Sequence, residues 1–176
     1  TRLVAVAPTL SEPGSDIVVR TRLEDVWGNP AAEPKTLIHS GFGDPGAYTI
    51  SVTDEQTELQ TETNPILVGV NDGYGRYWAD LHGQSEETIG TNSIDDYFRF
   101  GRDNAFLDAC AHQGNDFQIT DAFWDKIQQT TGEFNQPGKF VTFPGWEWSG
   151  NTGLGGDRNV LFREEGGIIS RSSRAL

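Results

Sequence analysis

The chain has 176 residues, of which 13 are Lys or Arg and 26 are Asp or Glu, so its formal net charge is −13. A chain this acidic lacks the clustered cations that nonspecific binding to nucleic acid or to an anionic membrane requires, so we expect neither as a partner. No apolar run approaches the roughly 20 residues that cross a bilayer, and we expect a soluble protein. The single cysteine, Cys110, excludes an internal disulfide framework and a multi-cysteine zinc site.

The first residue is Thr1 and not Met. Removal of a signal peptide, other proteolysis and a cloning choice would each explain this, so export is one option and the compartment stays open. The oligomeric state stays open as well.

Residues 1–75 have the pattern of a β domain. Short β-branched and apolar runs are separated by turn sequences, and no stretch has a helical period. We expect strands at residues 3–7, 16–23, 48–52 and 66–70. Tight turns are favoured between them at Pro13-Gly14 and Pro45-Gly46, because Pro fixes φ and Gly accepts positive φ. Several short strands at this spacing predict a small immunoglobulin-like β-sandwich.

The periodicity changes after Gly75, where strand-like runs begin to alternate with helical ones. We expect strands at residues 76–81, 106–111, 139–146 and 159–162. One helix is predicted to start after Asn92 or Ser93 and a second after Thr120 or Asp121, because these residues can cap a helix N-terminus. The sequence therefore predicts two domains, residues 1–75 and 76–176, and a fold class of α/β plus all-β.

The second domain is too short for a complete α/β barrel. Four predicted strands and two predicted helices stand against the roughly 250 residues that a closed eight-unit barrel takes. We therefore expect either a small open α/β layer or the N-terminal portion of a longer barrel.

Polar and metal-capable side chains lie near the end of each predicted strand of this domain, at the edge where α/β folds build their sites. His82 and Gln84 follow the first strand, His112 the second and Glu147 the third, while Asp157 precedes the fourth. Imidazole and carboxylate groups that converge from separate strands can hold zinc, manganese or iron and leave a position open for water. His82, His112 and Glu147 are the first candidates for metal ligands.

Each candidate also has an ordinary structural explanation. A single His near a strand end is usually a surface or core residue with a hydrogen bond. Asp80, a further candidate to assist the site, can instead cap a turn, and Glu147 can pair with Arg158. Joint placement on successive strand ends is what favours a site.

Four blocks of the second domain carry a family resemblance: residues 77–85 (YWADLHGQS), 111–116 (AHQGND), 143–149 (FPGWEWS) and 156–160 (GDRNV). In this order they resemble the PHP (polymerase and histidinol phosphatase) superfamily and, more narrowly, its branch called domain of unknown function 3604. The segment before them, with its turn at residues 26–30, is also similar to this branch, whose members often carry a sandwich-like domain before the barrel.

The resemblance implies a distorted (β/α)7 barrel with up to three divalent metal ions at the carboxyl ends of its strands, used to hydrolyse phosphoesters or related bonds. It implies metal ligands at His82, His112 and Glu147. Gln84 and Asp157 stand where the superfamily commonly has histidines, so they would be substituted ligands. Ligands from later strands would lie beyond Leu176, and this chain is expected to hold only part of such a site.

The leading hypothesis is a metal-dependent hydrolase, a phosphoesterase that acts on a small-molecule or ester substrate with metal-activated water. The alternative is a non-catalytic binding module, a degenerate barrel plus a sandwich, that recognises a glycan or a protein partner. Its candidate contacts are Trp78, Trp124, Trp146 and Trp148. The two hypotheses differ in whether a metal ion stabilises the fold.

Overall fold

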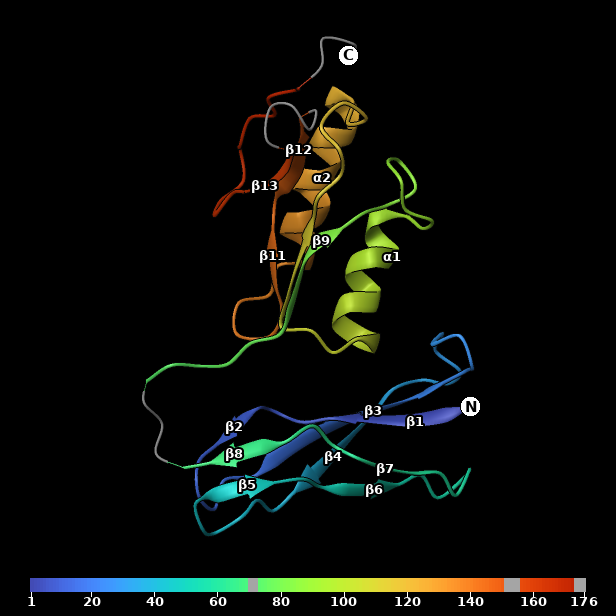
Figure 1. The fold of residues 1–176 in the computed structure, drawn as a ribbon, viewed down its shortest axis with the longest axis vertical. Coiled ribbons are helices and arrows are strands. Elements are labelled where there is room, and N and C mark those ends of the chain that lie inside the picture. The colour runs from blue at the N-terminus through green and yellow to red at the C-terminus, as the bar shows by residue number, and fades with distance from the viewer. Residues whose placement is uncertain (70–72, 151–155, 173–176) are drawn as a thin grey trace. The chain divides into compact units, whose positions relative to one another are not determined.

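The computed structural model describes residues 1–69, 73–150 and 156–172. The chain divides into two compact units, Thr1–Tyr77 and Trp78–Leu176, and each is described here by itself (Figure 1). The sequence places the change of periodicity after Gly75, near this division. No helix in the described part of the chain is long and apolar enough to cross a membrane.

The first unit consists of short strands. Two three-stranded sheets have the orders β1-β3-β4 and β2-β8-β5, and β6 pairs with β7. Neighbouring strands are antiparallel, except that β2 runs parallel to β8. The strands are β1 (Arg2–Val6), β2 (Leu10–Ser11), β3 (Ile17–Glu24), β4 (Lys35–His39), β5 (Gly46–Tyr48), β6 (Ser51–Thr53), β7 (Gln60–Glu62) and β8 (Ile66–Val68).

The core of the first unit follows the alternation of its strands. In β3, Ile17 and Val19 are each 1% exposed, whereas Val18 between them is 44% exposed. Because successive side chains of a strand point to opposite faces, one face of β3 lies in the core. The buried apolar residues that form this core are Leu3, Ala5, Ala7, Ile17, Val19, Ile50, Val52, Ile66 and Val68. The sheets of the unit therefore share one core.

The single strand predicted at residues 48–52 is wrong. The backbone N–H of Ile50 donates to Oγ1 of Thr63, and the N–H of Thr63 donates back to the oxygen of Ile50, both at 3.0 Å. The chain changes its pairing partner here, since β5 pairs with β8 whereas β6 pairs with β7. Residues 48–52, predicted as one strand, therefore contribute to two strands, β5 and β6.

The second unit has a parallel three-stranded sheet in the order β11-β10-β9, and β12 and β13 form an antiparallel pair. Helices α1 and α2 connect the three parallel strands (Figure 1). The elements are β9 (Ala79–Gly83), α1 (Ile94–Arg99), a π-helical turn η1 (Phe100–Asn104), β10 (Ala109–His112), α2 (Asp121–Phe134), β11 (Val141–Phe143), β12 (Gly145–Ser149) and β13 (Asp157–Leu161). The described residues form an open α/β layer and no closed barrel.

The predicted helix starts are confirmed. Oγ of Ser93 accepts a hydrogen bond from the N–H of Asp96, and Oγ1 of Thr120 accepts one from the N–H of Phe123, both at 3.1 Å. These are N-cap hydrogen bonds, which satisfy donors that the first helical turn leaves free. Both helices bury an apolar face against the core around Phe140.

The predicted strand at residues 139–146 is wrong in extent, because it divides into β11 and β12 at Pro144. Proline has no N–H to donate to a ladder, and its carbonyl accepts from the N–H of Phe162. From here the chain pairs with β13 and leaves the parallel sheet. This turn of the chain directs Glu147 toward the loop after β10.

Candidate functional site

The loop after β10 meets β12 at the carboxyl edge of the parallel sheet. The N–H of Glu147 donates to the oxygen of Gly114, and the N–H of Asp116 donates to the oxygen of Glu147, both at 2.9 Å. In the β12–β13 pair, Asn159 is the residue opposite Glu147. Backbone pairing therefore gathers side chains from three elements around one glutamate.

The carboxylate of Glu147 is the centre of this cluster. The residue is 6% exposed, and its Oε2 accepts hydrogen bonds from Nδ2 of Asn115 at 2.9 Å and from Nε2 of Gln84 at 3.2 Å. Nε2 of His82 lies 3.8 Å from the same oxygen. No Lys or Arg of the described residues forms an ion pair with Glu147. The neighbours of this buried carboxylate are thus two neutral amides and one imidazole.

The imidazole of His82 is held in one tautomer by Asn159. Nδ1 of His82 lies 2.8 Å from Oδ1 of Asn159, whose Nδ2 donates to the oxygen of Leu81 at 3.0 Å. Because Oδ1 of Asn159 can only accept, Nδ1 of His82 carries the proton in the neutral ring. In this neutral tautomer Nε2 is an acceptor, and it lies 3.8 Å from the acceptor Oε2 of Glu147.

Two acceptors at this separation could share a cation. Zinc–nitrogen and zinc–oxygen distances are about 2.0–2.2 Å, so an ion bonded to both atoms allows them to be as far as about 4.2 Å apart. The 3.8 Å between His82 and Glu147 falls within this limit. However, the described residues contain no group of three or more His, Cys, Asp and Glu side chains placed to hold a metal ion. The chain therefore presents two adjacent strong ligands and not a complete set.

His112 is buried beside this cluster and has other partners. Its Nε2 lies 2.9 Å from Oγ of Ser85, and its Nδ1 accepts from the N–H of Gly114 at 3.3 Å. Ser85 in turn donates to Oε2 of Glu87 at 2.6 Å. Burial lowers the pKa of His112 to about 4, although the charge of Glu87 acts to raise it. The imidazole is therefore neutral at pH 7, and both of its nitrogens are engaged.

The two predicted substitute ligands differ in their surroundings. Gln84 donates to Glu147, and its Oε1 accepts from Oγ1 of Thr88 at 2.7 Å, so its amide orients the glutamate. Asp157 is exposed at the start of β13, opposite Ser149. The structure thus brings His82, Gln84 and Glu147 together, whereas His112 and Asp157 make none of the hydrogen bonds of this cluster that the described residues show. Asp80 accepts the backbone N–H of His82 at 3.0 Å.

Sequence reasoning missed the two asparagines that hold the cluster. Asn115 holds Glu147, and Asn159 orients His82. Both lie in the polar runs near strand ends that the sequence analysis singled out, which was the available signal. Asn115 lies in the loop after β10, where an asparagine usually serves the local turn, and Asn159 lies in β13, so neither amide was recognised as a contact of the site.

The tryptophans proposed as binding contacts fall into two groups. Trp124 and Trp146 are 6% and 5% exposed, and their indole N–H groups donate to the oxygens of Gly167 and Ile168. These two rings hold the segment after β13 and offer no stacking face. Trp148 is half-buried with the guanidinium of Arg158 5.9 Å from its ring, and Trp78 is 60% exposed.

Comparison with known proteins assigns the chain to a family. Residues 55–173, more than half of the chain, match the family described as "Protein of unknown function (DUF3604)". Uncharacterized proteins of Chlamydia pneumoniae and Chlamydia trachomatis are 29% and 27% identical over 126 residues. These alignments cover 70% of this chain and 20% of each relative, so the chain spans about a fifth of the length of the curated relatives it matches. No solved structure matches. The chain belongs to the DUF3604 family.

Proposed function

We propose that this chain contributes part of the site of a metal-dependent hydrolase, specifically a phosphoesterase. The fold proposed for it is the N-terminal portion of a distorted PHP-type (β/α)7 barrel that follows an immunoglobulin-like sandwich. The observation that carries the proposal is the 3.8 Å approach of Nε2 of His82 to Oε2 of Glu147. Both atoms are acceptors in the neutral tautomer, and a shared cation would give each of them a partner.

The residues around this pair orient its two side chains. Oδ1 of Asn159 accepts a hydrogen bond from Nδ1–H of His82 and so keeps Nε2 available. Metal-binding histidines usually make such a hydrogen bond through the nitrogen that does not bind the metal. Gln84 and Asn115 fix the carboxylate of Glu147. A bound zinc, manganese or iron ion would lower the pKa of a coordinated water toward about 7 and so supply hydroxide at neutral pH. The remaining ligands would come from other parts of a protein as long as the Chlamydia relatives.

The exposure of His82 fits a small substrate. The side chain of His82 is 53% exposed, whereas that of Glu147 is 8% exposed. The pair therefore has one side toward solvent, from which a small ester could approach, and one side anchored in the protein. The alternative function, a non-catalytic module that binds a glycan or a protein, keeps Trp78 as its exposed aromatic contact.

Metal-dependent stabilisation tests the proposal. The chain is purified without chelators, and its thermal unfolding is followed by calorimetry with and without added zinc or manganese. A ligand at 100 times its Kd stabilises the folded state by about 2.7 kcal/mol, so a clear rise in Tm is expected. His82→Ala should abolish the rise, because it removes one of the two strong ligands that lie side by side in the described part of the chain.

His39→Ala is the matched control. His39 lies in the first unit, where its Nδ1 accepts the N–H of Gly41, so its removal should leave the metal effect unchanged. No rise in Tm for the unmodified chain, or a rise that persists in His82→Ala, would contradict the proposal and favour the binding module.

A further inference from the structure

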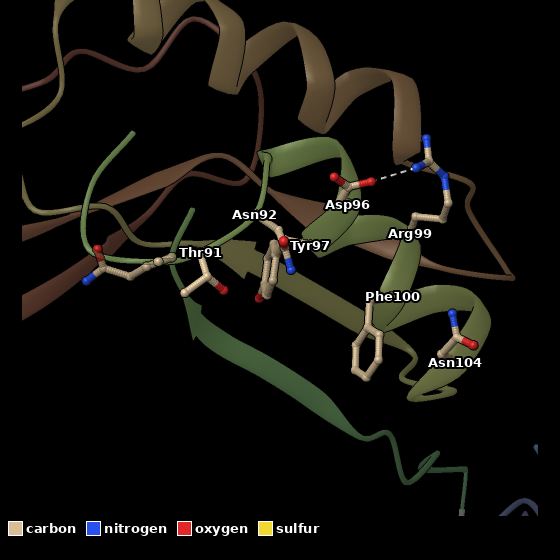
Figure 2. A pocket seen from close by; sticks show the side chains of 9 residues that line it. Thr91, Asn92, Asp96, Tyr97, Arg99, Phe100 and Asn104 are labelled. Carbon is tan, nitrogen blue, oxygen red and sulfur yellow. Dashed lines mark hydrogen bonds and ion pairs between the residues drawn. The ribbon is translucent and has the colours of Figure 1, made fainter. Parts of the chain in front are cut away.

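A pocket of about 480 Å³ opens beside α1, between the loop that precedes the helix and the side of α1 and η1 (Figure 2). Pockets that hold small molecules have volumes of about 300–1,000 Å³. All of the lining residues belong to the second unit, and Gln84 is the single lining residue that also contacts Glu147. The pocket is therefore large enough for one small ligand, and neither His82 nor Glu147 lines it.

Two aromatic rings, those of Tyr97 and Phe100, line this pocket (Figure 2). The two residues are three positions apart, which places them on the same side of a helical segment. The hydroxyl of Tyr97 hydrogen-bonds to the backbone oxygens of Asp80 and Ala111 at 3.2 Å, so this ring is fixed. Glycine is required at position 83, because a Cβ there would collide with the ring of Tyr97. Phe100 is 43% exposed and offers an accessible apolar face.

The remaining lining is polar and carries no net charge. The amide side chains of Asn92 and Asn104 line the pocket, and an amide can both donate and accept hydrogen bonds. Its two charged groups, Asp96 and Arg99, form an ion pair at 2.8 Å. Since these charges offset each other, the pocket gives no general preference to an anion or to a cation.

We propose that this pocket binds a neutral, polyhydroxylated ligand, of which a sugar ring is the natural example. A sugar has an apolar C–H face that can pack on the ring of Phe100, and its hydroxyl groups can both donate to and accept from the amide of Asn92. A wholly apolar ligand would offer this amide no hydrogen bond, which costs free energy. The inference goes beyond the proposed hydrolase activity and does not depend on it.

Titration of the 176-residue chain with sugars tests the site. Glucose, galactose, mannose and N-acetylglucosamine are the neutral probes, with glucuronate and glucosamine as charged comparators, and binding is measured by calorimetry and saturation-transfer NMR. At least one neutral sugar should bind and should do so more tightly than both charged comparators. Phe100→Ala should raise its Kd roughly three- to tenfold, the usual value of an aromatic contact. Asn92→Ala, in the loop before α1, should also weaken binding.

Phe117→Ala is the matched control, because Phe117 is 42% exposed but does not line the pocket. The Kd of Phe117→Ala for the neutral sugar should equal that of the unmodified chain. Failure of all four neutral sugars to bind, tighter binding of a charged comparator, or an equal loss in Phe100→Ala and Phe117→Ala would overturn the inference.

Discussion

The two units bury carboxylates in different ways. In the first, Glu24 is 2% exposed and accepts from Nε of Arg2 and Nε of Arg22, both at 2.6 Å. In the second, Glu147 and Asp116 are also buried, but the described residues give them only amide, backbone N–H and hydroxyl donors, besides the imidazole near Glu147. A carboxylate between guanidinium groups has opposite charges beside it, whereas one among neutral donors has no cation beside it in the described part of the chain.

The difference separates a buried carboxylate that is paired with cations from one that the proposed function would use. Burial raises the pKa of Glu24, but hydrogen bonds and charges from Arg2 and Arg22 outweigh this, so that its pKa lies below the ordinary value. The ionised form of Glu24 therefore stabilises the fold. Glu147 has no such guanidinium partner among the described residues.

The largest expected effect concerns His112. Its pKa is about 4 in the folded chain and about 6.5 in an unfolded one. Between these values the unfolded chain binds a proton that the folded chain does not. The contribution of the neutral imidazole to the free energy of unfolding is therefore fully present above about pH 6.5. It should fall by up to about 3 kcal/mol as the pH approaches 4. Urea unfolding at a series of pH values measures this loss.

His112→Gln is the variant that sharpens this measurement, because glutamine does not titrate. Fluorescence reports chiefly on the second unit, where four of the five tryptophans lie. Subtracting the pH profile of the variant from that of the unmodified chain removes the contribution of the carboxylates. Identical profiles would mean that the neutral, buried imidazole does not contribute to the pH dependence of the second unit.

The next effect concerns the first unit. Glu24→Gln removes the charge that both guanidinium groups face, and the side chain of Arg22 is only 15% exposed. We expect a loss of about 1–3 kcal/mol in the free energy of unfolding of this unit. Calorimetry of the chain measures it, with Glu62→Gln on the exposed face of β7 as the control. A loss no greater than that of the control would show that the two arginines do not stabilise the buried charge.

Local features of the fold were predictable from the sequence, whereas features set by distant partners were not. The sequence narrows the N-caps to Asn92 or Ser93 and to Thr120 or Asp121, because a cap depends on residues within one turn. In the structure Ser93 and Thr120 are the caps. The break between β5 and β6 depends on Thr63, which lies far along the chain, and no local pattern marks it. The division at Pro144 could have been predicted, since proline lacks an N–H and interrupts a strand. The apolar residues on both sides of it favoured one continuous strand instead.

The sequence predicts which strand ends carry the candidate site, but it does not predict which atoms meet there. Parallel strands place their carboxyl ends at one edge, so proximity of His82 and Glu147 could be expected from topology. Which atoms meet depends on side-chain rotamers and on tertiary hydrogen bonds. Ser85 and Gly114 engage the nitrogens of His112, and Asn159 engages that of His82, through contacts that no sequence spacing specifies.

The smallest expected effect is the one that decides what the comparison means. Without metal, Glu147→Gln should leave the free energy of unfolding unchanged or raise it by up to about 1 kcal/mol. The new amide oxygen can take the place of Oε2 and accept from Gln84 and Asn115, so both hydrogen bonds are kept while the buried carboxylate is removed. Urea unfolding in a chelating buffer measures the change. If Glu147→Gln instead lost as much as Glu24→Gln, both glutamates would stabilise their units in the same way, and the difference between the units would not indicate a site.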